Sequence, residues 1–323
     1  MEQGAEAMLQ RRKVVIVGAG AVGSTFAYAL ARDGAAEEIV LLDANASLVA
    51  GQVLDLAHGQ PFFPSVNIRA GTPDDYAGAS VVVITAGAAQ RPGESRLDLL
   101  QRNRKIIEEI VDDIVASGSR AVILVVTNPV DVLAYVAWRR SGWPAGRVIG
   151  SGTVLDSARL RYLLSRYLQV DTHSVHAYVL GEHGDSQLVA WSLSHVGGVP
   201  VDTYCAGQER FAAWPREKER IAEEVRRSAY HIIDYKGATW FGVGMALVRI
   251  VRSLLRDEKS ILTVSTVLQG EYGLKKVCLS VPCIVGREGV ETIITTKLQE
   301  KEQEALERSA GVIRGAIDQL GIS

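Results

Sequence analysis

The sequence has 323 residues, of which 47% are hydrophobic and 22% charged, so it can build two globular domains and is too apolar to be wholly disordered. Its formal net charge of −2 gives no support to a nucleic-acid-binding protein, which needs clustered positive charge. No apolar run is long enough to span a membrane, and Met1–Lys13 lacks the apolar core of a secretory signal. Three cysteines without a C-x-x-C pair argue against a disulfide scaffold or a structural zinc site, and predict a cytoplasmic protein.

The first half of the chain alternates short β-branched runs with stretches of helical spacing. The expected strands are Val14–Val17, Ile39–Leu42, Val81–Thr85 and Val122–Val126. The expected helices are Ala21–Arg32, Ser47–His58, Leu97–Ala116 and Val130–Arg140. Strands that are apolar on both faces and alternate with helices predict an α/β domain with a Rossmann-type doubly wound parallel sheet, over residues 1–147.

The second half mixes helices and strands, and predicts an α+β domain over residues 148–323. Helical spacing covers Leu155–Leu168 and Arg216–Ile233, and a closing helix carries an apolar stripe from Leu306 to Leu320. The expected strands are Val175–Leu180, Ile261–Leu268 and Lys276–Val285.

A glycine cluster follows the first expected strand in the pattern Gly18-x-Gly20-x-x-Gly23. Glycines at this spacing let the backbone approach a pyrophosphate at the N-terminus of a helix. Asp43 ends the second expected strand, where a carboxylate accepts hydrogen bonds from the adenosine ribose and repels a 2′-phosphate. The alternative is that Asp43 caps the next helix. The pattern predicts a dinucleotide site that prefers NAD to NADP.

Residues suited to hydride chemistry occur in later clusters. His183 lies between glycines in GEHGD and can move a proton at neutral pH. Asp156 and Arg159 lie one helical turn apart, so Asp156 can orient His183 while Arg159 grips a substrate carboxylate. Arg96 follows Pro92-Gly93 and suits a loop that closes over a substrate and polarises its ketone. Taken singly, these residues also fit a surface ion pair and an ordinary loop histidine.

In this order the motifs resemble the L-lactate and malate dehydrogenase family, most closely its bacterial L-lactate dehydrogenases, over essentially the whole chain. The resemblance implies proton transfer by His183 with Asp156 as its partner, a carboxylate clamp at Arg159 and a mobile-loop arginine at Arg96. It assigns substrate contacts to Gln90, Arg96, Asn128 in TNPVD, Arg159 and Thr239 in KGAT. It assigns dinucleotide contacts to Gly18, Gly20, Val22, Gly23, Asp43, Gly87, Ala88, Thr127, Asn128 and Ser151.

Substrate choice depends on the loop before Arg96. The family carries glutamine there when pyruvate is the substrate and arginine when oxaloacetate is; alignment on PGESR places Gln90 at that position and Arg91 after it. A neutral amide leaves the second carboxylate of oxaloacetate unpaired. We therefore expect an NAD-dependent L-lactate dehydrogenase of glycolysis and fermentation. The alternatives are a malate dehydrogenase, an enzyme for bulkier 2-oxo acids with Trp240 setting pocket size, and a non-catalytic NAD-binding redox sensor.

Two further histidines suggest either a metal site or an effector site. In a strand, His173 and His176 would point to opposite faces, so no metal site is expected. Relatives are often activated by fructose 1,6-bisphosphate, held at a subunit interface by an arginine and a histidine that match Arg161 and His176. The alternative is two ordinary surface residues. The resemblance also implies a homo-oligomer, most often a tetramer.

Overall fold

A parallel sheet forms the centre of the first half of the chain in the computed structural model, which describes residues 12–88 and 93–322. Its strands are β1 (Lys13–Val17), β2 (Glu38–Leu42), β3 (Asn67–Ala70), β4 (Val81–Ile84), β5 (Val122–Val125) and β6 (Val148–Gly150). They lie in the order β3-β2-β1-β4-β5-β6, and all neighbouring pairs are parallel. This is the strand order of a doubly wound dinucleotide-binding fold, so the predicted α/β class is confirmed.

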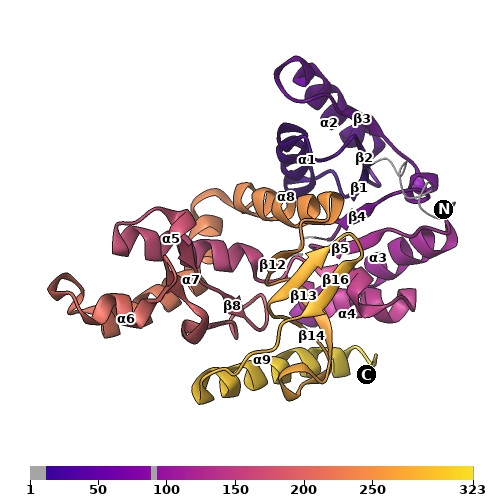
Figure 1. The fold of residues 1–323 in the computed structure, drawn as a ribbon. Coiled ribbons are helices and arrows are strands. Elements are labelled where there is room, and N and C mark those ends of the chain that lie inside the picture. The colour runs from indigo at the N-terminus through magenta and orange to yellow at the C-terminus, as the bar shows by residue number, and fades with distance from the viewer. Residues whose placement is uncertain (1–11, 89–92, 323) are drawn as a thin grey trace, which may run out of the picture.

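Helices pack against this sheet, and further helices of the second half of the chain lie to one side of it (Figure 1). Those of the first half are α1 (Ala21–Asp33), α2 (Ala46–His58), α3 (Arg96–Ala116) and α4 (Val130–Ser141). Those of the second half are α5 (Val154–Leu168), α6 (Val201–Ala206), α7 (Trp214–Lys236), α8 (Phe241–Arg256) and α9 (Glu300–Gln319). Helix α8 was not predicted, although it places Leu247, Ile250, Val251 and Leu254 on one buried face at helical spacing, and it packs against α1.

The remaining strands come from the second half. They are β7 (Val175–His176), β8 (Val179–Leu180), β9 (Leu188–Val189), β10 (His195–Val196), β11 (Val199–Pro200), β12 (Ser260–Leu262), β13 (Ser265–Gln269), β14 (Lys275–Ser280), β15 (Cys283–Gly286) and β16 (Gly289–Ile293). Small antiparallel sheets join β11-β10-β7, β12-β15-β16 and β8-β9. Together with helices α5 to α9, these strands make the expected mixed second half.

Strands β13 and β14 extend the large sheet antiparallel to β6, with Ser265 opposite Gly150. The sheet therefore runs across the predicted boundary at residues 147 and 148, which stays a prediction. This pairing also brings Ser265 beside the N-terminus of α4, a contact that matters for the site described below.

Each of the three predicted strands of the second half divides in two. Val175–Leu180 becomes β7 and β8, and Ile261–Leu268 becomes β12 and β13, with the two parts in different sheets. Lys276–Val285 divides at Pro282, which has no N–H to donate to a sheet. Thr263 separates β12 from β13 because its carbonyl accepts a hydrogen bond from the Thr153 N–H instead of pairing with a strand.

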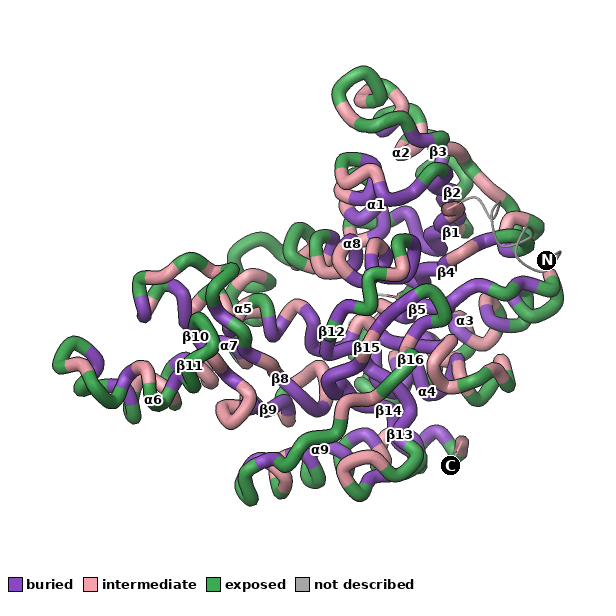
Figure 2. The backbone as a smooth tube through the Cα atoms, in the orientation of Figure 1, coloured by how far each residue is buried: buried purple, intermediate pink, exposed green. Residues whose placement is uncertain are grey.

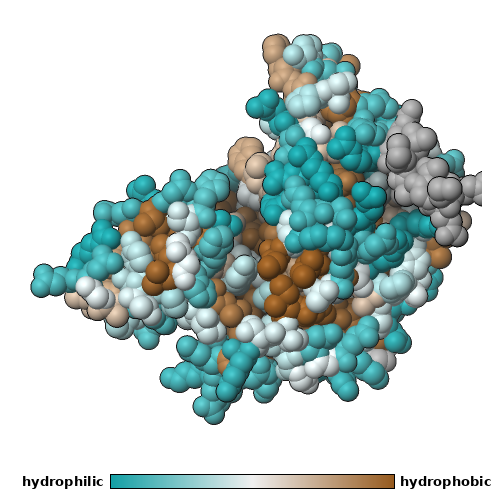
Figure 3. Space-filling view, in the orientation of Figure 1, coloured by the Kyte–Doolittle hydropathy of each residue, from teal (hydrophilic) through white to brown (hydrophobic). Residues whose placement is uncertain are grey.

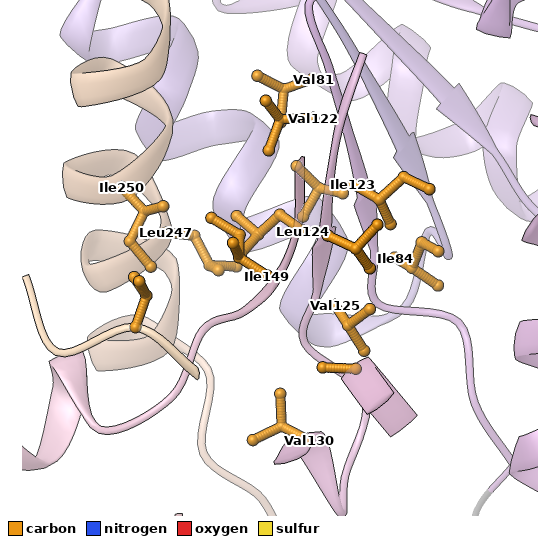
Figure 4. Close-up of a cluster of buried hydrophobic side chains, with 14 of the residues drawn as sticks. Val81, Ile84, Val122, Ile123, Leu124, Val125, Val130, Ile149, Leu247 and Ile250 are labelled. Atoms are coloured by element: carbon orange, nitrogen blue, oxygen red, sulfur yellow. The ribbon is translucent and has the colours of Figure 1, made fainter. Parts of the chain in front are cut away.

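The larger hydrophobic core lies between the sheet and its helices, and a second cluster lies among α5, α7 and the small strands near them. In Figure 4, Leu247 and Ile250 of α8 point toward Ile149 and Leu124 of the sheet, and all four side chains are fully buried. Figure 2 shows the same pattern along the chain, with buried central strands and exposed outer turns of the helices.

The surface in Figure 3 is mostly hydrophilic, with apolar side chains gathered toward the middle of the view. Among the described residues, no helix combines the length and the apolar character that crossing a bilayer requires.

Candidate active site

A cavity of about 540 Å³ brings together side chains from distant parts of the chain. It is lined by Arg96 of α3, Asn128 after β5, Asp156 and Arg159 of α5, and His183. Helices α7 and α9 complete the wall with Arg226, Tyr230 and Gln319. Its volume suits a small organic substrate, and it contains most of the residues predicted for proton transfer and substrate binding.

Helix α5 supplies two of these groups from its first two turns. Its start is fixed by Thr153, whose N–H donates to Ser280 Oγ and whose hydroxyl donates to the Val179 carbonyl. Asp156 lies in the first turn, where the helix dipole favours a carboxylate. Arg159 Nη1 donates to Asp156 Oδ1 at 2.7 Å, so the two residues form an ion pair, but it is partly buried and is not the surface pair of the alternative interpretation.

His183 completes the arrangement from the loop after β8. Its Nδ1 lies 2.6 Å from Asp156 Oδ2, while its backbone N–H donates to Asp131 Oδ2 at 2.8 Å. The bond at Nδ1 places a hydrogen on that nitrogen and leaves Nε2 as the atom that exchanges a proton. Gly181, at φ +89°, has no room for a side chain because a Cβ would lie 2.7 Å from Ser309 Oγ.

The charges of Asp156 and His183 support each other. Burial opposes the charge of the Asp156 carboxylate, which is 2% exposed, but His183 and Arg159 outweigh this effect and lower its pKa. Burial likewise opposes a charged His183, yet the attraction of Asp156 and their hydrogen bond raise the pKa of His183 above its ordinary value. The imidazole is therefore able to hold a proton at neutral pH and release it to a bound substrate.

Arg96 is the first residue of α3, and a capping box fixes the start of that helix. Ser95 Oγ accepts a hydrogen bond from the Asp98 N–H, and the Asp98 carboxylate accepts one from the Ser95 N–H. This box fixes the start of the helix from which Arg96 lines the same cavity as His183.

A second cavity, of about 690 Å³, lies at the carboxyl ends of β1, β2 and β4. Gly18, Gly20, Asp43, Gly87 and Ala88 are among the residues that line it. Ligands of doubly wound folds bind at such a point, where the strand order reverses. The structure therefore gathers these five predicted dinucleotide residues around one space.

The three glycines of the turn differ in the space around them. Gly18, at φ +108°, lies against β4, where a Cβ would meet Ala86 N at 2.6 Å. Gly23 lies under the turn, where a Cβ would lie 1.9 Å from the Gly18 carbonyl oxygen. A Cβ on Gly20 would meet no protein atom within 4 Å. The open side of the turn at Gly20 is the one that a pyrophosphate would approach.

Asp43 is held by backbone donors from two sides. Oδ2 accepts from Ala19 N at 2.8 Å and Oδ1 accepts from Asn45 N at 2.9 Å. The residue that caps α2 is Asn45, whose side chain accepts from Leu48 N, so the capping alternative for Asp43 is wrong. Its carboxylate is a fixed acceptor in the second cavity.

For the other predicted contact residues, the structure gives only a place in the fold or a single hydrogen bond. Val22 lies in the first turn of α1, Thr127 Oγ1 donates to Ala86 O, and Ser151 N donates to Val125 O. Thr239 lies between α7 and α8 and is not among the described residues that line the 540 Å³ cavity. Gln90 and Arg91 lie outside the described residues. These assignments stay predictions.

Two buried polar residues were missed by sequence reasoning. Asn103 of α3 accepts from Ala88 N at 2.8 Å and donates to Asn128 O at 3.3 Å, so it joins the dinucleotide loop to the substrate loop. Asp131 of α4 holds the backbone of His183. The sequence signal for Asn103 was a polar residue on the apolar stripe of a helix, and for Asp131 it was membership of the TNPVD motif.

Comparison with known families matches both halves of the chain. Residues 12–150 match the family described as lactate/malate dehydrogenase, NAD binding domain, and residues 153–321 match its alpha/beta C-terminal domain. An L-lactate dehydrogenase of Treponema denticola is 55% identical over 96% of this chain and 99% of its own length. One of Thermoanaerobacter pseudethanolicus is 48% identical over 96% of this chain and 99% of its own length.

Solved structures show the same likeness. A lactate dehydrogenase from a Medee basin deep-sea metagenome library superposes with a TM-score of 0.94 at 44% identity, covering 97% of this chain and 100% of that one. The ligands-bound form of a minor L-lactate dehydrogenase from Enterococcus mundtii superposes with a TM-score of 0.93 at 41% identity, covering 96% of this chain and 98% of that one.

Proposed function

This chain belongs to the lactate/malate dehydrogenase family and carries its NAD-binding domain, and we propose that it reversibly reduces pyruvate to (S)-lactate with NADH. The observation that carries the chemistry is the contact of His183 and Arg159 with the buried Asp156 in one cavity. The test of function is oxidation of NADH by the purified protein on addition of pyruvate.

The residues divide the work of the reaction. NADH supplies the hydride to the carbonyl carbon when it is bound. His183 donates its Nε2 proton to the carbonyl oxygen, which becomes the hydroxyl of lactate, and Asp156 stabilises the charged imidazole before that transfer. Arg159 has further N–H groups beside the one that contacts Asp156, and these bind the substrate carboxylate. Arg96 stabilises the negative charge that develops on the carbonyl oxygen.

Substrate choice follows from Gln90. In Gln90→Arg we expect kcat/KM for oxaloacetate to rise relative to pyruvate by about 10²–10³-fold, since an unpaired or mismatched charge in a closed site costs several kcal/mol. Side-by-side kinetics of both substrates check this. The same change at Gln101, exposed on α3, is the matched control and leaves the ratio unchanged. An unaltered ratio in Gln90→Arg would remove Gln90 from substrate selection.

The other functions have less support. Malate dehydrogenase activity would need a cation for the second carboxylate, and Arg91 is the competing residue for that task. The Trp240 ring contacts Lys236 and Phe241 and does not line the described part of the 540 Å³ cavity, so it gives no support to a pocket for bulkier 2-oxo acids. A non-catalytic redox sensor would not require the contact between His183 and Asp156.

We also propose an effector site for fructose 1,6-bisphosphate at Arg161 and His176 in a homo-oligomer, most simply a tetramer. Both residues line one cavity of about 480 Å³, and within the described chain Arg161 Nε is buried without a hydrogen-bond partner. Met245 of α8 is an exposed apolar side chain that lines this cavity, and the exposed Phe241 lines a neighbouring cavity together with Met245. Such a surface suits contact with a second copy.

The effector proposal predicts that fructose 1,6-bisphosphate raises kcat/KM for pyruvate or the mass of the assembly. Arg161→Leu and His176→Gln should each abolish that response, measured by kinetics and light scattering with and without the bisphosphate. His173→Gln, at a neighbouring exposed histidine, is the control and keeps the response. If fructose 1,6-bisphosphate changes neither the rate of the wild-type protein nor the mass of its assembly, the proposal is contradicted.

Two organisational assignments complete the proposal. We place the division between the NAD-binding and substrate-binding parts at residues 147 and 148, a few residues before the NAD-binding match ends at residue 150 and the C-terminal match begins at residue 153. A cytoplasmic location is supported by the three cysteines, which are all buried free thiols.

A further inference from the structure

Asp131 is a buried carboxylate behind the candidate active site. It lies in the first turn of α4 and is 1% exposed. Its Oδ2 accepts the backbone N–H of His183 at 2.8 Å, and its Oδ1 accepts the hydroxyl of Ser265 at 2.6 Å. Each carboxylate oxygen thus has a donor, and one of those donors belongs to the residue that moves the proton.

The contact with Ser265 depends on the way the large sheet is completed. Ser265 begins β13, the strand that continues the parallel sheet beyond β6. Its side chain is fully buried, and its hydroxyl also lies 3.2 Å from Cys278 Sγ of β14. Asp131 therefore joins the loop of His183 to the strand that the second half adds to the first.

The surroundings of Asp131 make its charge matter. Burial is the main influence on Asp131 and raises its pKa to about 6, while Ser265 and His183 favour the charged form and Glu182 opposes it. The negative charge of Asp131 in turn favours the protonated form of His183. Because burial weakens solvent screening, the electrostatic interaction between the charge of Asp131 and the nearby His183 is strong.

Other charged or titratable groups line the same cavity as His183, and the test must separate them from Asp131. They are Asp156 and Arg159 from α5, Arg96 from α3, Glu182 and Asp185 from its own loop, and Arg226 and Tyr230 from α7. On the opposite side, Asp131 faces the thiol of Cys278. Only Asp156 and Asp131 accept hydrogen bonds from His183 among the described residues.

We propose that Asp131 is a positioning residue for the reaction: it fixes the backbone of His183 and places a second carboxylate, besides Asp156, beside the residue that transfers the proton. This inference rests on the proposed function. It adds Asp131 as a second carboxylate besides Asp156, the partner that the sequence predicts for His183. Asp156 holds the ring and Asp131 holds the backbone, so the two carboxylates act on the same imidazole from different elements.

The test is Asp131→Asn, which keeps an acceptor for His183 N and gives Ser265 Oγ a donor. Reduction of pyruvate requires protonated His183, so kcat/KM falls as pH rises through the pKa of His183. Without the charge of Asp131 that pKa is lower, and we expect the midpoint of the fall to move about half a unit to one unit toward acid. Ser265→Ala removes a hydrogen bond that stabilises the charged form of Asp131. We expect it to move the pH midpoint of kcat/KM in the same direction by a smaller amount.

Matched controls distinguish this role from a structural one. Glu302→Gln replaces a buried carboxylate of α9 that accepts hydrogen bonds from Ser192, and Ser253→Ala removes a buried hydroxyl of α8. Neither should move the midpoint. A purely structural Asp131 predicts lower thermal stability in Asp131→Asn with an unmoved midpoint. Because the raised pKa makes the charged form costly above pH 6, we expect Asp131→Asn to melt no lower than the wild type at pH 7.

A readout without turnover separates this inference from the proposed function. Titration of the His183 ring by NMR, assigned with His183→Asn, should show the lower pKa in Asp131→Asn even if pyruvate is not the substrate. An unshifted His183 titration in Asp131→Asn overturns the inference. If Asp131→Asn does not fold, an unshifted titration in Ser265→Ala overturns it equally. Failure of the wild type to reduce pyruvate would contradict only the proposed function.

Discussion

His183→Asn should lower kcat by about 10²–10⁴-fold, the usual contribution of a general acid, in both directions of the reaction. An asparagine amide fits the space but cannot donate and recover a proton at neutral pH. NADH should bind with unchanged affinity, because the dinucleotide residues line a separate cavity. Stopped-flow turnover and NADH fluorescence titration measure the two effects.

The control for this substitution is His231→Asn, at an exposed histidine of α7. It should leave both turnover and NADH affinity at wild-type values. Turnover in His183→Asn close to that of the wild type would exclude His183 as the proton donor. A parallel loss of NADH binding would indicate that the substitution disturbs the fold rather than the proton transfer.

Arg159→Lys should lower kcat/KM for pyruvate by about 10²–10³-fold, mainly through KM. Lysine keeps the positive charge but loses the planar fork that binds a carboxylate through two parallel bonds, each worth about 1.5–3 kcal/mol. The charge beside Asp156 is retained, so we expect the pH midpoint set by His183 to stay nearly unchanged. Steady-state kinetics over a range of pH check both statements.

Arg166→Lys makes the same replacement at an exposed position on the same helix, α5. It should not alter KM for pyruvate. If Arg159→Lys also has a wild-type KM, then Arg159 serves only as the partner of Asp156 and another group binds the carboxylate.

Strands β1, β2, β4 and β5 could be predicted from the sequence because they are apolar on both faces and lie between helices. Strands β3 and β6 were not predicted, since β3 is a partly exposed polar run at the edge of the sheet and β6 has only three residues. The same reasoning failed where a strand changes sheets. Ile261–Leu268 is one apolar run, but its two ends pair with different partners, and Thr263 interrupts it by accepting a hydrogen bond from Thr153. Hydrophobic periodicity indicates which faces of a strand are buried, but it does not indicate which neighbouring strand or helix buries them.

The candidate site shows a similar division. The proximity of Asp156 and Arg159 could be predicted from their spacing on one helix. The role of His183 could be predicted from the chemistry of its side chain. The role of Asp131 could not, because it depends on a hydrogen bond to a backbone N–H 52 residues away and on a strand that joins the sheet later in the chain. Asn103 was hidden for the same reason, since both of its partners are backbone atoms of loops distant in sequence.

Side-by-side kinetics of pyruvate and oxaloacetate with NADH are the decisive measurement of whether this chain is an enzyme for pyruvate. We expect kcat/KM for pyruvate to exceed that for oxaloacetate by about 10²-fold or more, because the second carboxylate of oxaloacetate would have no partner. A wild-type enzyme that prefers oxaloacetate would contradict this expectation.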